Sequence, residues 1–253
     1  MKRILFVAAL LLVAGPAFAQ VGAQPGGIAG SQLRPNSGAA AFTTFDPSND
    51  LWHVTLSGGN LTATNATCTA GTGFAFCGAR GTSPTTHASP DKVFYECTLA
   101  SAAANHILCG FQSSSYNPAS AFSTIGYDSN SYSMGYDSVA GSGFIGGSAF
   151  GSGWVSACIG GTTQIVQFAV DFGAQLIWAR CLQAGSVFSN WNNSGTANPA
   201  TGTGGNSFSA IAGIATYYIA MGGNTTGDSV TINVGATAFT LGTTPPAGFL
   251  AWH

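Results

Sequence analysis

Charged residues are scarce in this chain, and the scarcity excludes several classes of partner. The 253 residues include eight acidic side chains and only six basic ones. Two of the basic residues stand at the very start, which leaves four for the rest of the chain: Arg34, Arg80, Lys92 and Arg180. A nucleic-acid groove needs several cations to neutralise phosphates. We therefore expect neither nucleic acid nor an anionic membrane surface as a partner.

No apolar run is long enough to span a membrane, which takes roughly 18–20 residues. The run at residues 4–14 follows Lys2 and Arg3 and precedes Ala17-Phe18-Ala19. A positive start, a short apolar stretch and an A-x-A site are typical of a secretory signal peptide. We expect cleavage after Ala19 and export to the periplasm, the cell surface or the medium, with an uncleaved anchor as the alternative. Removal of 19 residues leaves 234.

Residues that could carry catalysis are few as well. The chain has one glutamate, Glu96, and no Gly-x-Ser-x-Gly motif. Glycoside hydrolysis needs two carboxylates facing each other across a cleft, and no spacing here nominates a pair. The four histidines are scattered. The sequence thus predicts no catalytic residue, and a glycan-active enzyme is the third choice of function.

Six cysteines in an exported chain predict disulfides. If residues 93–100 and 106–112 form a hairpin, Cys97 lies opposite Cys109, and a turn at residues 71–73 brings Cys68 near Cys77. Cys158 and Cys181 are then paired by elimination. No Cys-x-x-Cys occurs, and His106 and Cys109 would point to opposite faces of a strand. We expect no metal and no cofactor.

The spacing of apolar residues predicts an all-β fold. Residues 20–41 are rich in Gly, Ala, Gln and Ser and predict a flexible lead. From residue 42 to 253, short apolar runs are separated by Gly, Ser, Asn and Pro, which is typical of an antiparallel β-sandwich. Val230, Ile232 and Val234 alternate with polar residues, as in a strand with one wet face.

One hairpin is predicted in detail. The nearly continuous apolar run at residues 164–170 indicates a central strand covered on both faces. Residues 171–174 form the turn, with Gly173 at positive φ, and residues 175–182 return antiparallel. The return strand presents Leu176, Trp178, Arg180 and Leu182 on one face and Ile177, Ala179 and Cys181 on the other.

Several segments together resemble the SPRY domain, and more narrowly its bacterial and phage relatives. They are residues 45–50 (FDPSND), 92–98 (KVFYECT), 126–136 (GYDSNSYSMGY), 171–178 (DFGAQLIW), 191–202 (WNNSGTANPATG), 228–235 (DSVTINVG) and 245–249 (PPAGF). Val93 stands where that family has a Trp, and residues 161–164 lack its Gly-Asp. The resemblance implies a concanavalin-like jelly-roll sandwich that binds without catalysis, through loops at one end.

The predicted ligand-binding loops are residues 116–136 and 186–206. They combine aromatic rings with Asn, Ser and Gly, a composition that suits recognition surfaces. The candidate contacts are Tyr116, Tyr127, Asn130, Tyr132, Tyr136, Trp191 and Asn192. The alternative for each ring is that it covers a sheet edge or an end of the sandwich. Trp154 and Trp178 are expected in the core.

These observations predict an exported, noncatalytic recognition module for a protein or a glycan. The alternative is a structural subunit of an envelope layer, an appendage or a phage-derived particle, for which a surface poor in charge and rich in Gly, Ser, Thr and Asn is equally suitable. Particles or filaments in solution would favour this self-assembling subunit.

Overall fold

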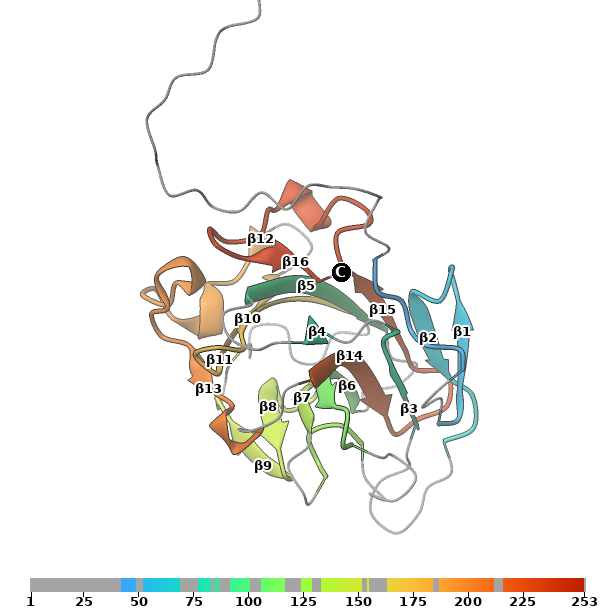
Figure 1. Ribbon diagram of the computed structural model, residues 1–253. Coiled ribbons are helices and arrows are strands. Elements are labelled where there is room, and N and C mark those ends of the chain that lie inside the picture. Colours follow the sequence, from blue (N-terminus) through green and yellow to red (C-terminus); the bar gives the residue numbers. More distant parts are fainter. Residues whose placement is uncertain are drawn as a thin grey trace, which may run out of the picture. The chain divides into compact units, whose positions relative to one another are not determined.

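The computed structural model describes residues 42–48, 52–68, 77–82, 85–86, 92–100, 106–116, 124–128, 133–151, 154, 163–183, 187–211 and 216–252. These residues form two β-sheets and contain no α-helix (Figure 1). The predicted all-β antiparallel sandwich is confirmed. The predicted signal peptide and lead, residues 1–41, lie outside the described residues.

The first sheet has nine strands, in the order β1-β2-β15-β5-β10-β11-β12, with β13 on β11 and β16 on β5. All of its pairs are antiparallel except β16–β5. The strands are β1 (Val54–Ser57), β2 (Thr62–Asn65), β5 (Lys92–Ala100), β10 (Thr163–Asp171), β11 (Leu176–Gln183), β12 (Val187–Phe188), β13 (Asn206–Ser207), β15 (Ser229–Asn233) and β16 (Leu250–Ala251).

The second sheet has seven antiparallel strands, in the order β3-β14-β6-β7-β8-β9, with β4 on β14. They are β3 (Cys77–Arg80), β4 (Thr85–Thr86), β6 (Ile107–Ser113), β7 (Ser133–Asp137), β8 (Ser142–Ile145), β9 (Ser148–Phe150) and β14 (Thr216–Gly223). Short 3-10 turns lie between strands: η2 (Trp191–Asn193), η3 (Pro199–Thr201), η4 (Ser209–Ile211) and η5 (Thr240–Gly242).

The main core lies between the two sheets. Alternate residues of each central strand point inward, as the period of two requires. On β5 they are Val93, Tyr95, Cys97 and Leu99, and on β10 they are Val166, Phe168 and Val170. Rings dominate the centre, where Phe168 contacts Tyr95, Tyr136 and Trp154. Trp154 and Trp178 are both buried, as predicted.

Both sheets also carry a smaller apolar cluster on the outer face. Outside the nine-stranded sheet, Phe94, Ala169, Trp178, Phe239 and Phe249 pack together. Outside the seven-stranded sheet, the cluster is Leu108, Tyr116, Ile125 and Ala220. The sandwich therefore has covering layers on both sides, built by the connections between strands.

The β10–β11 hairpin forms as predicted, but its turn does not. Strand β10 pairs with both β5 and β11, so it is central. The backbone of Ala174 donates to Asp171 Oδ1 at 2.8 Å. The left-handed residue is Gln175, with φ of 55°, and Gly173 is not among the residues at positive φ. The assignment of positive φ to Gly173 was wrong, because the turn lies one residue further along the chain than predicted, at residues 172–175, and its left-handed position is Gln175.

The predicted disulfides Cys68–Cys77 and Cys97–Cys109 are both present, with Cα–Cα distances of 5.5 and 6.7 Å. The hairpin used to predict the second pair is wrong. Strand β5 belongs to the nine-stranded sheet and β6 to the seven-stranded sheet, and the two are not paired. The cysteines meet because both point into the core between the sheets.

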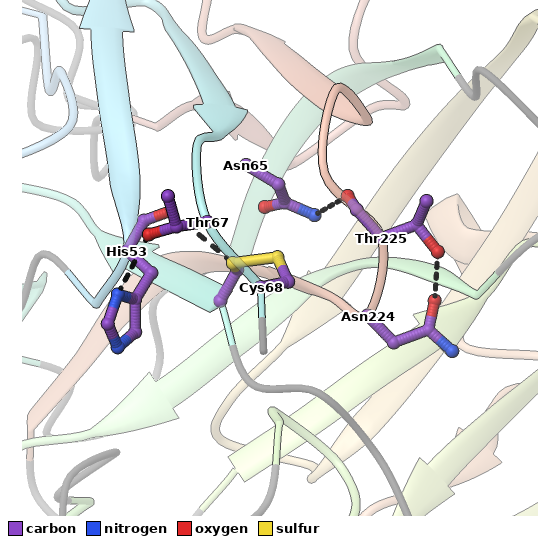
Figure 2. The surroundings of a disulfide bond; sticks show 7 residues. His53, Asn65, Thr67, Cys68, Asn224 and Thr225 are labelled. Carbon is purple, nitrogen blue, oxygen red and sulfur yellow. Dashed lines mark hydrogen bonds between the residues drawn. A yellow bond between two sulfur atoms is a disulfide. The ribbon is translucent and has the colours of Figure 1, made fainter. Parts of the chain in front are cut away.

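The Cys68–Cys77 bridge also joins the two sheets, since Cys68 follows β2 and Cys77 opens β3 (Figure 2). Beside it, Asn65 Nδ2 donates to the carbonyl of Thr225 at 3.0 Å. Cys181 is disulfide-bonded, and its predicted partner Cys158 lies outside the described residues. Within the described part of the chain, no helix is long and apolar enough to cross a membrane.

Candidate functional site

The described aromatic residues of the two predicted ligand-binding loops lie on opposite outer faces of the sandwich. Tyr116 packs in the cluster outside the seven-stranded sheet, with Tyr127 against it. Trp191 packs against the cluster outside the nine-stranded sheet. These residues are therefore not brought together at one end of the sandwich.

Tyr136 and Tyr116 are not surface residues. Tyr136 is 0% exposed in the core between the sheets, where its hydroxyl donates to Gln164 Oε1 at 3.3 Å. Tyr116 is 5% exposed. The prediction that these two rings contact a ligand was wrong, because Tyr136 points inward from β7 and Tyr116 covers the outer face of the sheet. Asn130 and Tyr132 lie outside the described residues.

Tyr127 is half-buried and forms part of a polar group with His106 and Asp137. Its ring stacks on Phe144 at 4.5 Å, and its hydroxyl donates to Asp137 Oδ2 at 2.8 Å. His106 Nδ1 lies 2.5 Å from the same oxygen. The other carboxylate oxygen of Asp137, Oδ1, accepts from the backbone of Val139 at 2.8 Å. A fully buried carboxylate is thus satisfied from several elements.

The two partners shift each other's pKa. The hydrogen bond to Asp137 raises the pKa of His106 above its ordinary value of 6.5, with burial opposing the shift. Burial acts to raise the pKa of Asp137, but the hydrogen bonds from His106, Tyr127 and Val139 outweigh it, so this pKa is lowered. The charged pair is therefore the stable form in the folded protein around pH 6.

We expect this pair to make stability depend on pH. The contribution of His106 is fully present below about pH 6.5 and is lost as pH rises through its raised folded pKa. The contribution of Asp137 is present above about pH 4 and is lost as pH falls through its lowered folded pKa. Denaturant unfolding of His106→Gln should therefore lose the decline in stability that the parent protein shows as pH rises above about 6.5. An unchanged profile in this variant would contradict the assignment.

Asn192 is a positioning residue, because its side chain is used inside the protein. It adopts a left-handed conformation with φ of 49°, which Asn tolerates well. Its Oδ1 accepts from the backbone of Ala179 at 2.8 Å and from Trp154 Nε1. Its Nδ2 donates to the carbonyl of Gly204 at 2.6 Å. These bonds fix η2 on β11 and leave the neighbouring Trp191 half-buried on the outer face.

Trp191 lies beside a cation. The guanidinium carbon of Arg180 is 4.5 Å from the centre of the Trp191 ring and 4.9 Å from that of Phe188. Arg180 comes from β11, Phe188 from β12 and Trp191 from η2, so three consecutive segments converge. Cation–π contacts of this kind contribute about 0.5–2 kcal/mol each, depending on exposure. Arg180 itself is half-buried.

A row of polar side chains across three strands holds Arg180 in place. Glu96, Gln167 and Arg180 are register partners on β5, β10 and β11. Arg180 Nε donates to Gln167 Oε1 at 2.9 Å, and Gln167 Nε2 donates to Glu96 Oε2 at 2.8 Å. Thr240 caps the row, donating to Glu96 from its hydroxyl at 2.8 Å and from its backbone at 3.2 Å. Gln167 Nε2 also donates to Thr243 Oγ1 at 2.6 Å.

This row was not predicted from the sequence. Arg180 was placed on the Trp178 face of its strand, but the register that aligns it with Gln167 and Glu96 was not predicted. A polar Gln167 in an otherwise apolar central strand was the available signal. Both oxygens of Glu96 accept hydrogen bonds, so this carboxylate is occupied in holding Gln167 and Thr240.

Several segments of this sheet and of the layer over it carry exposed apolar side chains. Among the described residues, Val187 is 56% exposed, Leu241 57% and Leu250 65%. Leu241 is in η5, between the two threonines of the row, whereas Val187 pairs with Gln183 and so points to the opposite side of β12 from Phe188. Leu250 is on β16, which Figure 1 shows on the same side of the molecule as β12. We call Arg180, Phe188, Trp191 and Leu241 together the Arg180 face.

Comparisons with known proteins give structural similarity without a family assignment. No protein-family model matches the chain, and no curated protein matches it. Among solved structures, 76% of the chain aligns with the TRIM65 PSpry domain (TM-score 0.48, 11% identity, 92% of that chain). The same share aligns with the SPRY domain of human HERC1 (0.46, 12%, 99%) and with stonustoxin (0.46, 13%). The chain spans 27% of the stonustoxin chain.

The described residues hold no group of three or more His, Cys, Asp and Glu side chains placed to bind a metal ion. What this part of the chain offers instead is one half-buried cation beside two aromatic rings, flanked by exposed apolar side chains. That combination suits recognition of another molecule.

Proposed function

We propose that the chain is an exported, noncatalytic module that recognises a protein partner through the Arg180 face. The observation that carries the proposal is the convergence of Arg180, Phe188 and Trp191 beside η5, where Leu241 is exposed. Interfaces are enriched in aromatic residues and arginine, which give large contact area at low cost in side-chain entropy.

Several further observations support this function. The SPRY-like sequence segments imply binding without catalysis, and the chain's one glutamate is occupied in a structural hydrogen-bond row. Two disulfides that join the sheets are suited to an oxidising compartment, as export would require. The exposed apolar residues favour a protein over a glycan, because large aliphatic side chains match another protein surface better than a sugar.

A substitution at Leu241 tests the proposal. Leu241→Asp places a charge on a side chain that is 57% exposed, so the effect on stability should be within about 1 kcal/mol. The immobilised protein is incubated with exported proteins of its source organism, and each captured protein is purified. Its dissociation constant should rise at least tenfold in this variant, because an unpaired carboxylate is then buried at the contact.

Trp52→Ser is the matched control. Trp52 is 36% exposed, pairs with Gly78 next to the cysteine of the Cys68–Cys77 bridge, and precedes β1, which is at the opposite edge of the nine-stranded sheet from β12. Its loss should leave the dissociation constant unchanged. Equal affinities for Leu241→Asp and the parent protein would contradict the proposed surface, and binding of a neutral glycan array alone would contradict the protein partner.

A further inference from the structure

We infer that the Arg180 face recognises a carboxylate, supplied by an acidic segment of the partner, through the free edge of the Arg180 guanidinium. This inference deepens the proposed function and rests on it. It specifies the chemical group of the partner that contacts Arg180. The exposed apolar residues of the surface do not define that group.

The first argument is the orientation of the guanidinium. Its Nε donates to Gln167, which in turn donates to Glu96, so hydrogen bonds hold the guanidinium on its Nε side. Its central carbon lies over the rings of Trp191 and Phe188. Neither Nη atom has a hydrogen-bond or ion-pair partner among the described residues. A planar fork with a free edge is the geometry that binds a carboxylate with two parallel bonds.

The second argument is charge. Lys92 Nζ lies 3.0 Å from Asp171, so that cation is already paired. Arg180 reaches its nearest carboxylate, Glu96, only through Gln167. Burial lowers the pKa of Arg180 and Glu96 opposes the shift, yet a guanidinium stays charged at neutral pH. A half-desolvated cation without a direct counter-ion gains more from an incoming anion than a fully hydrated one does.

The chemistry of the site favours a carboxylate over a phosphate. A phosphate group carries about two negative charges and three strong acceptor oxygens. One guanidinium, with its Nε already engaged, offers a single two-pronged edge. A carboxylate has one charge and two oxygens, which that edge satisfies completely. The exposed Leu241 would then contact an apolar neighbour of the acidic residue.

Arginine side-chain NMR tests the inference on the full-length oxidised protein, because the chain contains only four arginines. With 15N-labelled arginine, the Nε–H signal of Arg180 is the one that disappears in Arg180→Lys. Sodium acetate should shift this signal saturably, while sodium chloride at equal ionic strength should not. The signal of Arg80, whose guanidinium lies over Tyr218, serves as the internal control.

Peptide probes then separate the two sources of a carboxylate. Acetyl-Gly-Gly-Asp-Gly-Gly-amide offers a side-chain carboxylate, its Asn counterpart offers none, and Gly-Gly-Ala-Gly-Gly with a free C-terminus offers a terminal one. The Asp peptide or the free-terminus peptide should shift the Arg180 signal, and the Asn peptide should not. Arg180→Lys should weaken binding of that probe at least tenfold, because lysine cannot form the two-pronged bond.

Three outcomes would overturn the inference. They are no saturable acetate shift at Arg180, equal shifts at Arg80 and Arg180, and tighter binding of inorganic phosphate than of acetate. These are distinguishable from failure of the proposed function. If a captured protein depends on Leu241 but binds Arg180→Lys equally well, the proposed surface is supported and the carboxylate site is contradicted. If acetate binds at Arg180 but no captured protein depends on the face, the carboxylate site is supported and the proposed function is contradicted.

Discussion

Replacing both Cys97 and Cys109 with alanine should lower the free energy of unfolding by about 3 kcal/mol or more. The bridge closes a segment of 12 residues in sequence separation, and a loop of this size contributes about 3 kcal/mol in the chain-entropy model. Both cysteines are fully buried between β5 and β6 of opposite sheets. For a domain of this size, the melting temperature should fall by about 6–12 °C.

The matched control is Cys68→Ala/Cys77→Ala. That bridge has a separation of 9 residues, so its entropic contribution is nearly the same. Cys68, however, is half-buried, whereas Cys97 and Cys109 sit in the main core. We therefore expect the core pair to cost more than the peripheral pair in urea unfolding. A core variant as stable as the parent protein would contradict the cross-sheet arrangement.

Trp178→Ala should lower the free energy of unfolding by about 3–5 kcal/mol, the usual range for a buried tryptophan. Trp178 points away from the main core, yet it is 0% exposed. Phe249 packs edge-on against it, and its Nε1 donates to the carbonyl of Thr203 at 2.8 Å. The size of the loss measures how completely the connections between strands cover the outer face of the nine-stranded sheet.

Trp191→Ala supplies the comparison from the same face. Trp191 is half-buried and contacts the edge of Phe94 at a centroid distance of 6.5 Å. Its removal should cost about 1 kcal/mol, well below the loss at Trp178, while weakening partner binding. Thermal or urea unfolding of the two variants side by side gives the answer. Equal losses would place Trp191 in the covering layer as a purely structural residue.

The strands with strong apolar periodicity were predictable from the sequence, and so were the faces of their side chains. The hairpin of β10 and β11 and the alternation in β15 follow directly from the period of two. The pairing of β5 with its neighbours was not predictable. Cys97 of β5 could meet Cys109 of β6 either within a hairpin or across the core between two sheets. Spacing alone cannot distinguish these arrangements.

Glycine gave the most misleading signal around Tyr136. The Gly, Ser and Tyr composition of residues 126–136 predicted a loop, but Ser133–Asp137 is a buried strand, β7. A Cβ atom at Gly135 would lie 2.7 Å from the carbonyl oxygen of Ile125, and one at Gly110 would lie 2.0 Å from that of Met134. The glycines are needed for close packing of chain segments, a requirement that composition cannot separate from loop flexibility.

The candidate site was half predictable. Trp191 was predicted as a ligand contact from its polar loop, whereas Arg180 was assigned only to the Trp178 face of its strand and not to the site. The alignment of Glu96, Gln167 and Arg180 depends on the register of three strands that are distant in sequence. Local patterns do not encode this register, because a shift of two residues preserves every inward-facing side chain.

Hydrogen–deuterium exchange of the complex with a captured partner tests the central claim most directly. The account predicts that binding slows amide exchange in residues 187–205 and 239–250, which form and flank the Arg180 face. Exchange in residues 124–128 and 133–151, on the seven-stranded sheet and its outer side, should stay unchanged. Protection confined to this second set would contradict the account, because it would place the binding surface on the opposite side of the sandwich.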